Sequence, residues 1–209
     1  MSSAARAEPR PTAYVVDDDE AIRTLWRWLM ESQGIAVQTF ATAGEFIDAY
    51  RQGPGCLVLD LRLPGMSGLE LQEYLKQRGI EIPVVFMSAH GDVPAAVSAL
   101  KGGAVDFIQK PFSYREVLSV IAKAFERDGE LRRRRALRSM LAERLAALTE
   151  REREVMGRVI EGKQNKLIAA ELDISVKTVE VHRAKVMEKM GADSVAELVQ
   201  LMLQRTGEA

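Results

Sequence analysis

The chain has 209 residues, 47% hydrophobic and 28% charged, with a formal net charge of −1 at pH 7. It is therefore long enough for one or two domains, and bulk charge does not mark it as a nucleic-acid binder. Its apolar runs fall well short of the roughly 20 residues that span a bilayer, and its start lacks the apolar core of a signal peptide. Its single cysteine, Cys56, offers no disulfide framework. We therefore expect a cytoplasmic protein with no membrane partner.

Two halves of the chain differ in charge. Residues 1–125 hold 12 Lys and Arg against 15 Asp and Glu, whereas residues 126–209 hold 17 against 15. The halves are therefore expected to have different partners. The basic excess is small, and four of its arginines form one run, 132–135, which is typical of a solvated segment.

Alternating strands and helices are predicted for the first half. A short disordered tail is expected at residues 1–11. Five runs rich in Val and Ile follow, separated by segments of helical length: 13–16, 35–39, 56–59, 82–87 and 104–108. Five such βα units predict an α/β fold with a doubly wound, five-stranded parallel sheet. Capping boxes at Ser67/Glu70 and Ser113/Glu116 mark two helix starts.

Polar residues stand at the ends of these runs: Asp17, Asp18, Asp60, Ser88 and Lys110. In an open α/β sheet, ligands bind beyond the carboxyl ends of the strands. Grouped carboxylates suit Mg2+, a free carboxylate can attack phosphorus, and a lysine can balance the charge that develops. The set predicts phosphoryl transfer, with Asp60 as the nucleophile.

Four motifs resemble the receiver domain of two-component response regulators. They are Val-Val-Asp-Asp-Asp (15–19), Leu-Asp-Leu-Arg-Leu-Pro-Gly-Met-Ser-Gly (59–68), Met-Ser-Ala (87–89) and Phe-Ile-Gln-Lys-Pro-Phe (107–112). The resemblance covers residues 12–125 and implies a flavodoxin-like receiver fold. It also implies that Asp60 accepts a phosphoryl group from a sensor histidine kinase.

Further roles follow from this resemblance. Asp17, Asp18, Asp60 and the backbone carbonyl of Arg62 would bind Mg2+, while Asp19 is expected to cap the first helix. By the same resemblance, Ser88 is a switch hydroxyl, Phe107 an aromatic that moves with it, and Lys110 the partner of the phosphoryl group, with a cis Lys110–Pro111 bond. Taken singly, these three could be a loop hydroxyl, a core residue and an exposed lysine.

The phosphoryl group is expected to be flanked by Arg62, Ala89 and His90. Because Arg62 and His90 are large and polar, we expect them to set the lifetime of the acyl phosphate by controlling access of water. The alternative is two solvated surface side chains. The chain is otherwise not expected to be an enzyme, since it would catalyse only its own phosphoryl acceptance and slow dephosphorylation.

The connector, residues 126–147, is expected to be mostly helical. It has no Pro and one glycine, Gly129, the expected point of flexure, and it begins a leucine stripe at helical spacing: Leu137, Leu141, Leu145 and Leu148. We expect this stripe to pack on the chain's own domains; the alternative is pairing with a second chain.

A small all-α domain with helix-turn-helix spacing is predicted for residues 148–209. Capping boxes at Thr149/Glu152 and Ser194/Glu197 start two helices, and two tightly joined helices, 166–172 and 176–190, lie between them. Ser175 would cap the second, whose inner face would hold Val179, Val186 and Met190.

The strings 148–155 and 174–183 resemble the LuxR-type helix-turn-helix of the NarL/FixJ class. By position, Glu180, Val181 and Ala184 would face bases, and Lys163, Lys166, Lys177, Thr178, Arg183 and Lys185 would face phosphates. A solvated charged face is the alternative for the basic residues. The last helix would carry dimer contacts by resemblance or serve its own domain.

Together these observations predict a transcriptional response regulator that phosphorylation of Asp60 switches toward a homodimer on double-stranded promoter DNA, with RNA polymerase as a further partner. Two other functions are considered. The first is an aspartate-nucleophile phosphohydrolase, which is disfavoured because Asp60-Leu-Arg62 lacks a second acid two residues on, and the second is a receiver whose helical domain binds protein or RNA.

Overall fold

The structure is a computed structural model that describes residues 10–89 and 93–206. The predicted disordered tail lies outside this part of the chain, apart from its last two residues. The chain divides between Arg132 and Arg133 into two compact units. None of the helices in the described segments has the length and apolar character needed to cross a membrane.

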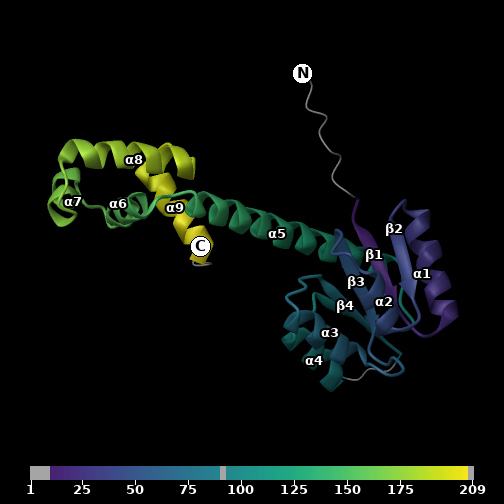
Figure 1. The fold of residues 1–209 in the computed structure, drawn as a ribbon. Helices are drawn as coiled ribbons and strands as arrows, with labels where there is room; N and C mark the ends of the chain where they lie inside the picture. Colours follow the sequence, from purple (N-terminus) through teal and green to yellow (C-terminus); the bar gives the residue numbers. More distant parts are fainter. Residues whose placement is uncertain (1–9, 90–92, 207–209) are drawn as a thin grey trace. The chain divides into compact units, whose positions relative to one another are not determined.

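A five-stranded parallel sheet forms the centre of the N-terminal unit, in the order β2-β1-β3-β4-β5 (Figure 1). The strands are β1 (Thr12–Val16), β2 (Ala36–Phe40), β3 (Gly55–Asp60), β4 (Val84–Ser88) and β5 (Asp106–Gln109). All five predicted strands are confirmed, although β4 and β5 start two residues late. Pro83 has no N–H to donate to a ladder, and the amide of Ala104 bonds to Ala99 in the turn before β5.

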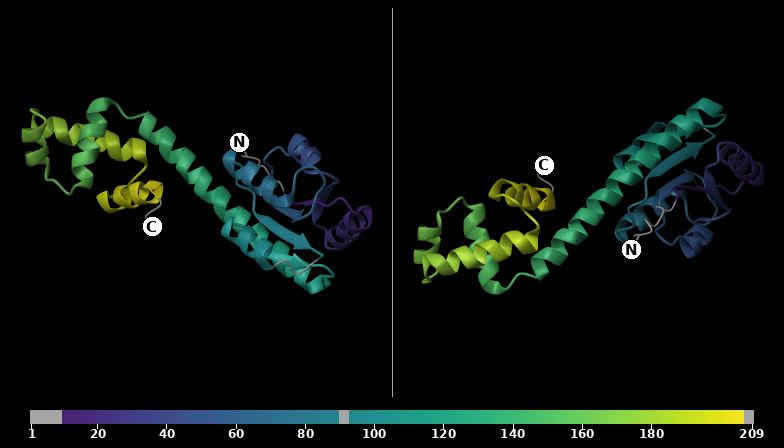
Figure 2. Two further views of the ribbon diagram at one scale, coloured as in Figure 1. Left: turned by 90° about the horizontal axis from the view of Figure 1, so that it is seen from below. Right: turned by 90° about the horizontal axis from the view of Figure 1, so that it is seen from above.

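Helices cover both faces of this sheet, as predicted for a doubly wound fold. One face packs on α1 (Glu20–Ser32) and the first turns of α5 (Tyr114–Ala146), which run along the sheet in Figure 2. The other packs on α2 (Ala43–Ala49), α3 (Gly68–Gln77) and α4 (Val93–Lys101). Successive β1 residues alternate between the two cores, as the pleat requires.

Helix starts in this unit follow the predicted caps. Asp19 accepts a hydrogen bond from the Ala21 amide at 2.8 Å, and both capping boxes are formed, with each serine hydroxyl accepting from the third helical amide. The spacing of Ile22, Leu25, Trp26, Leu29 and Met30 predicts one apolar stripe along α1. Trp26, Leu29 and Met30 are buried, but Leu25 is 39% exposed. The buried stripe is therefore narrower than its spacing predicts.

A half-buried ion pair between Asp128 and Arg132 of α5 contacts the start of β3. The Asp128 carboxylate is 3% exposed and accepts from the Gly55 amide at 2.9 Å and from Arg132 Nε at 2.8 Å. The Arg132 guanidinium also donates to the carbonyls of Gln52, at 3.1 Å, and Gly53. A Cβ at residue 55 would lie 1.9 Å from the carbonyl oxygen of Thr12, so only glycine fits there.

The C-terminal unit is helical. After the end of α5 come α6 (Glu150–Ile160), α7 (Asn165–Glu171), α8 (Val176–Met190) and α9 (Val195–Thr206), grouped together in both views of Figure 2. The predicted inner face of α8 is confirmed, since all three of its residues are buried. Buried Glu152 pairs with Lys189 at 2.6 Å, and this contact lowers the pKa of Glu152 to about 2.

The leucine stripe of the connector belongs to the hydrophobic core of the C-terminal unit. Leu141 and Leu148 are buried in it, and Leu137 and Leu145 pack against it. Gly129 lies inside the continuous α5 helix. On α9, Leu198 is buried in the same core, so this helix packs within its own domain. At its start, Ser194 accepts from the Glu197 amide, but the Glu197 carboxylate bonds to Asp193 instead of closing the predicted box.

Candidate functional site

The strand register brings the predicted polar residues to one edge of the sheet. Val16 of β1 pairs with Leu59 of β3, so the next residues, Asp17 and Asp60, are level with each other. In the neighbouring pairs, Asp60 aligns with Met87, and Ser88 aligns with Gln109 just before Lys110. The order of the strands reverses at β1 and β3, which is where α/β folds place their ligands.

Three carboxylates meet at this edge. Asp17, Asp18 and Asp60 each offer an oxygen, and these oxygens lie within 4.8 Å of one another. Asp17 is fully buried, Asp60 is 8% exposed and Asp18 is open to solvent. Hard oxygen ligands at this separation, with one side open, fit a divalent cation such as Mg2+.

Lys110 joins the two buried carboxylates. Its Nζ lies 2.6 Å from Asp17 Oδ2 and 2.8 Å from Asp60 Oδ2, and the Lys110–Pro111 peptide bond is cis, as the resemblance implies. Burial raises the pKa of the Asp17 carboxyl group, against the opposing hydrogen bonds from Lys110 and the Asp19 amide. For Lys110, burial acts to lower the pKa, but the two carboxylates outweigh it and raise the pKa overall. The lysine therefore stays charged between two acids.

The remaining predicted residues surround this cluster. Ser88 is 3% exposed, and its carbonyl accepts from the Lys110 amide at 2.7 Å. Phe107 is partly buried against the core beneath α2, α3 and α4. Arg62 and Ala89 are exposed, and the Arg62 amide donates to Asp60 Oδ1 at 3.3 Å. His90 lies outside the described residues.

Gly68 is a site residue that motif reasoning did not single out for a role. Its amide donates to the carbonyl of Leu61 at 3.1 Å, and a Cβ at this position would lie 2.3 Å from the carbonyl oxygen of Asp60. A side chain at residue 68 would therefore displace the backbone that carries Asp60. The signal available in the sequence is a glycine placed directly after the capping residue Ser67.

The outer face of α8 is open. Ser175 caps this helix, accepting from the Thr178 amide at 3.0 Å. The exposed residues of the predicted DNA-facing set are Lys166 on α7 and, on α8, Lys177, Glu180, Val181, Ala184 and Lys185. The face is thus a small apolar strip between lysines, which suits a helix in the major groove.

Three of the predicted phosphate-facing residues have protein partners: the Thr178 hydroxyl lies 2.8 Å from that of Ser175, and Lys163 and Arg183 bond to other side chains. Lys163 Nζ lies 2.7 Å from Glu171 Oε1 and 3.0 Å from Glu161 Oε2, and these carboxylates raise its pKa. Arg183 donates to the Asn165 side chain at 2.9 Å. The Lys163 ammonium is thus paired with two carboxylates, whereas Lys177 and Lys185 make no ion pair in the described part of the chain.

Comparison with known families identifies both units. Residues 13–122 match the response regulator receiver domain, and residues 146–202 match the LuxR family of bacterial regulatory proteins. The chain is a two-component response regulator. It joins a receiver domain to a LuxR-type DNA-binding domain, and this pair of domains implies a histidine kinase and DNA as partners.

Similar proteins extend over nearly the whole response regulator. It is 44% identical to the transcriptional regulatory protein FixJ of Azorhizobium caulinodans, over 91% of this chain and 90% of that protein. It is 43% identical to the response regulator TodT of Pseudomonas putida, over 90% and 83%. The solved structure of the response regulator StyR matches with a TM-score of 0.84 at 44% identity, over 93% of this chain and 98% of that one. The regulator is thus a FixJ-like transcriptional regulatory protein, and its relatives favour neither a phosphohydrolase nor a protein- or RNA-binding domain.

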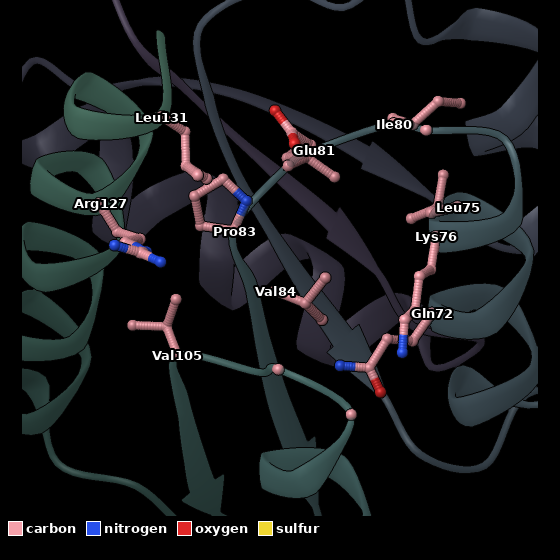
Figure 3. Close-up of a pocket in the computed structure, with 14 residues that line it drawn as sticks. Gln72, Leu75, Lys76, Ile80, Glu81, Pro83, Val84, Val105, Arg127 and Leu131 are labelled. Atoms are coloured by element: carbon pink, nitrogen blue, oxygen red, sulfur yellow. The ribbon is translucent and has the colours of Figure 1, made fainter. Parts of the chain in front are cut away.

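A separate cavity of about 350 Å3 lies in the receiver (Figure 3). Val84 and Val105 line it at the amino ends of β4 and β5, with Pro83 beside them and Arg127 and Leu131 of α5 facing across. The carboxylate cluster lies at the carboxyl ends of the strands. The cavity is therefore not part of that site.

Proposed function

We propose that Asp60 of this response regulator accepts a phosphoryl group from a phosphohistidine of its sensor kinase. The supporting observation is the Lys110 ammonium, which lies within 2.8 Å of carboxylates at the ends of both β1 and β3. A carboxylate oxygen of Asp60 forms a bond to phosphorus as the phosphorus–nitrogen bond breaks. The electron pair of the broken bond stays on the imidazole nitrogen of the kinase.

The carboxylates of Asp17, Asp18 and Asp60 and the main-chain carbonyl of Arg62 would hold Mg2+, which offsets negative charge on the transferring oxygens. Lys110 pairs with the phosphoryl group after transfer. Ser88 then turns toward it and Phe107 follows. Arg62, Ala89 and His90 flank it, and Arg62 and His90 set its lifetime by controlling access of water. The regulator catalyses no reaction beyond its own phosphorylation and slow dephosphorylation.

The output follows from this switch. In the proposed division, residues 12–125 form the receiver, 126–147 the linker and 148–209 the DNA-binding domain. In the cytoplasm, phosphorylation promotes a homodimer that binds two-fold promoter half-sites and contacts RNA polymerase. The base-facing residues are Glu180, Val181 and Ala184, and the phosphate-facing ones are Lys163, Lys166, Lys177, Thr178, Arg183 and Lys185.

Phosphorylation of purified protein tests this proposal. With acetyl phosphate and Mg2+, intact-protein mass spectrometry should show one added phosphoryl group on the wild type and none on Asp60→Asn. Asp48→Asn, which alters an exposed carboxylate on α2, is the matched control and should be modified like the wild type. Equal modification of Asp60→Asn would overturn the assignment. Genome-wide mapping of DNA bound by wild type and Asp60→Asn then tests the output, which identical maps would contradict.

A further inference from the structure

Arg23 lies beneath the loop that carries two of the clustered carboxylates. Its Nη1 donates to the main-chain oxygen of Asp17 at 2.7 Å and to that of Asp18 at 2.9 Å. The other guanidinium nitrogen, Nη2, bonds to the Glu20 carboxylate, and the side chain of Arg23 is only 12% exposed. The rigid, planar guanidinium fork of Arg23 therefore ties two consecutive carbonyls to the first turn of α1.

The two acidic side chains differ in what else holds them. The Asp17 carboxylate accepts from the Asp19 amide at 2.9 Å and from Lys110. The Asp18 carboxylate is exposed and has no hydrogen bond or ion pair among the described residues. The direction of Asp18 therefore depends on its backbone, and the Arg23 contact is made to that backbone.

We propose that Arg23 is a positioning residue for the divalent cation. By holding the Asp17 and Asp18 carbonyls, it presents the Asp18 carboxylate beside Asp17 and Asp60 before the cation arrives. The inference rests on the proposed function, in which these carboxylates bind Mg2+. Its basis is geometric, because the positive charge of a guanidinium would by itself repel a nearby cation.

Two substitutions separate geometry from charge. Arg23→Gln removes both the fork and the charge, so a purely electrostatic role predicts tighter Mg2+ binding, whereas positioning predicts weaker binding. Arg23→Lys keeps the charge but loses the fork, so only positioning predicts weaker binding. Arg27→Gln is the matched control. Arg27 lies one turn further along α1 and also bonds to Glu20, at 2.8 Å, but its other partners are Thr24 and Thr39, away from the acidic loop.

Calorimetric titration of full-length protein with Mg2+, without a phosphodonor, measures the effect. Both Arg23 variants should bind Mg2+ about tenfold more weakly than the wild type, the loss typical when a residue that orients metal ligands is removed, and Arg27→Gln should bind normally. If Arg23→Gln is too unstable to measure, Arg23→Lys alone decides. Wild-type affinity in the measurable Arg23 variants would overturn the proposal.

Asp18→Asn distinguishes this failure from failure of the proposed cation site. If the wild type binds Mg2+ and Asp18→Asn binds it weakly, the cation site stands, and normal binding by the Arg23 variants removes the role of Arg23 alone. If Asp18→Asn binds like the wild type, or the wild type does not bind, the cation site and the role of Arg23 fail together.

Discussion

Charged residues have opposite surroundings at the carboxylate cluster and on the outer face of α8. At the cluster, Asp17, Asp60 and Lys110 are largely buried and are held together by two short ion pairs. On α8, Lys177 and Lys185 are exposed and make no ion pair within the described part of the chain. A buried charge must be compensated for the domain to fold, whereas an exposed one costs little and stays available to a partner. Charge therefore contributes to folding at the carboxylate cluster, whereas the exposed charge on the outer face of α8 stays available to a partner.

The largest expected loss of stability is for Lys110→Met, which tests this difference between buried and exposed charge. Removing the ammonium leaves two carboxylates facing each other in a buried site, and we expect the receiver to lose about 3 kcal/mol of unfolding free energy. Urea denaturation without divalent cations measures the loss, and added Mg2+ should restore part of it.

Lys123→Met is the control for that substitution. Lys123 pairs with Asp106 at 3.2 Å, but its side chain is 60% exposed. We expect a loss below about 1 kcal/mol. If the two variants unfold at the same urea concentration, the contrast between buried and exposed charge is wrong.

Gly68→Ala breaks the same site without changing a charge. The new Cβ would contact the Asp60 carbonyl and Phe86, and we expect about 1–3 kcal/mol of destabilisation from the forced backbone shift. Thermal unfolding measures it. Gly44→Ala, in α2, places its Cβ no closer than 3.9 Å to Thr42 and should leave stability unchanged or slightly raised. Equal melting temperatures for the two variants would show that the tight approach at Gly68 is tolerated.

The smallest effect on stability is expected for the double substitution Lys177→Ala and Lys185→Ala. Unfolding free energy should change by no more than about 0.5 kcal/mol per site. DNA binding should weaken, and the slope of log K against log salt should fall by about 1 for each lysine that contacts a phosphate. Fluorescence anisotropy with a promoter fragment at several salt concentrations measures both. An unchanged slope would remove these lysines from the interface.

The strands and helices of the receiver could be predicted because hydrophobic residues repeat along its sequence with the periods of strands and helices. Strand ends in a parallel sheet share one edge, so Asp17, Asp60 and Lys110 could be placed together from the sequence alone. The contacts of Arg23, Asp128 and Arg132 with the main chain could not, because main-chain donors and acceptors carry no sequence signal. The partners of Lys163 and Arg183 depend on how α6, α7 and α8 pack. The exposure of Leu25 shows that spacing gives the direction of a buried stripe but not its width.

The Asp128–Arg132 contact with the start of β3 has a practical consequence for dissecting the protein. A fragment that ends at residue 122, where the receiver family match ends, would lack both side chains and leave the buried Gly55 amide without its acceptor. An isolated receiver intended for spectroscopy or kinase assays should therefore extend through Arg132, even though its last turns belong to a helix that continues into the second unit.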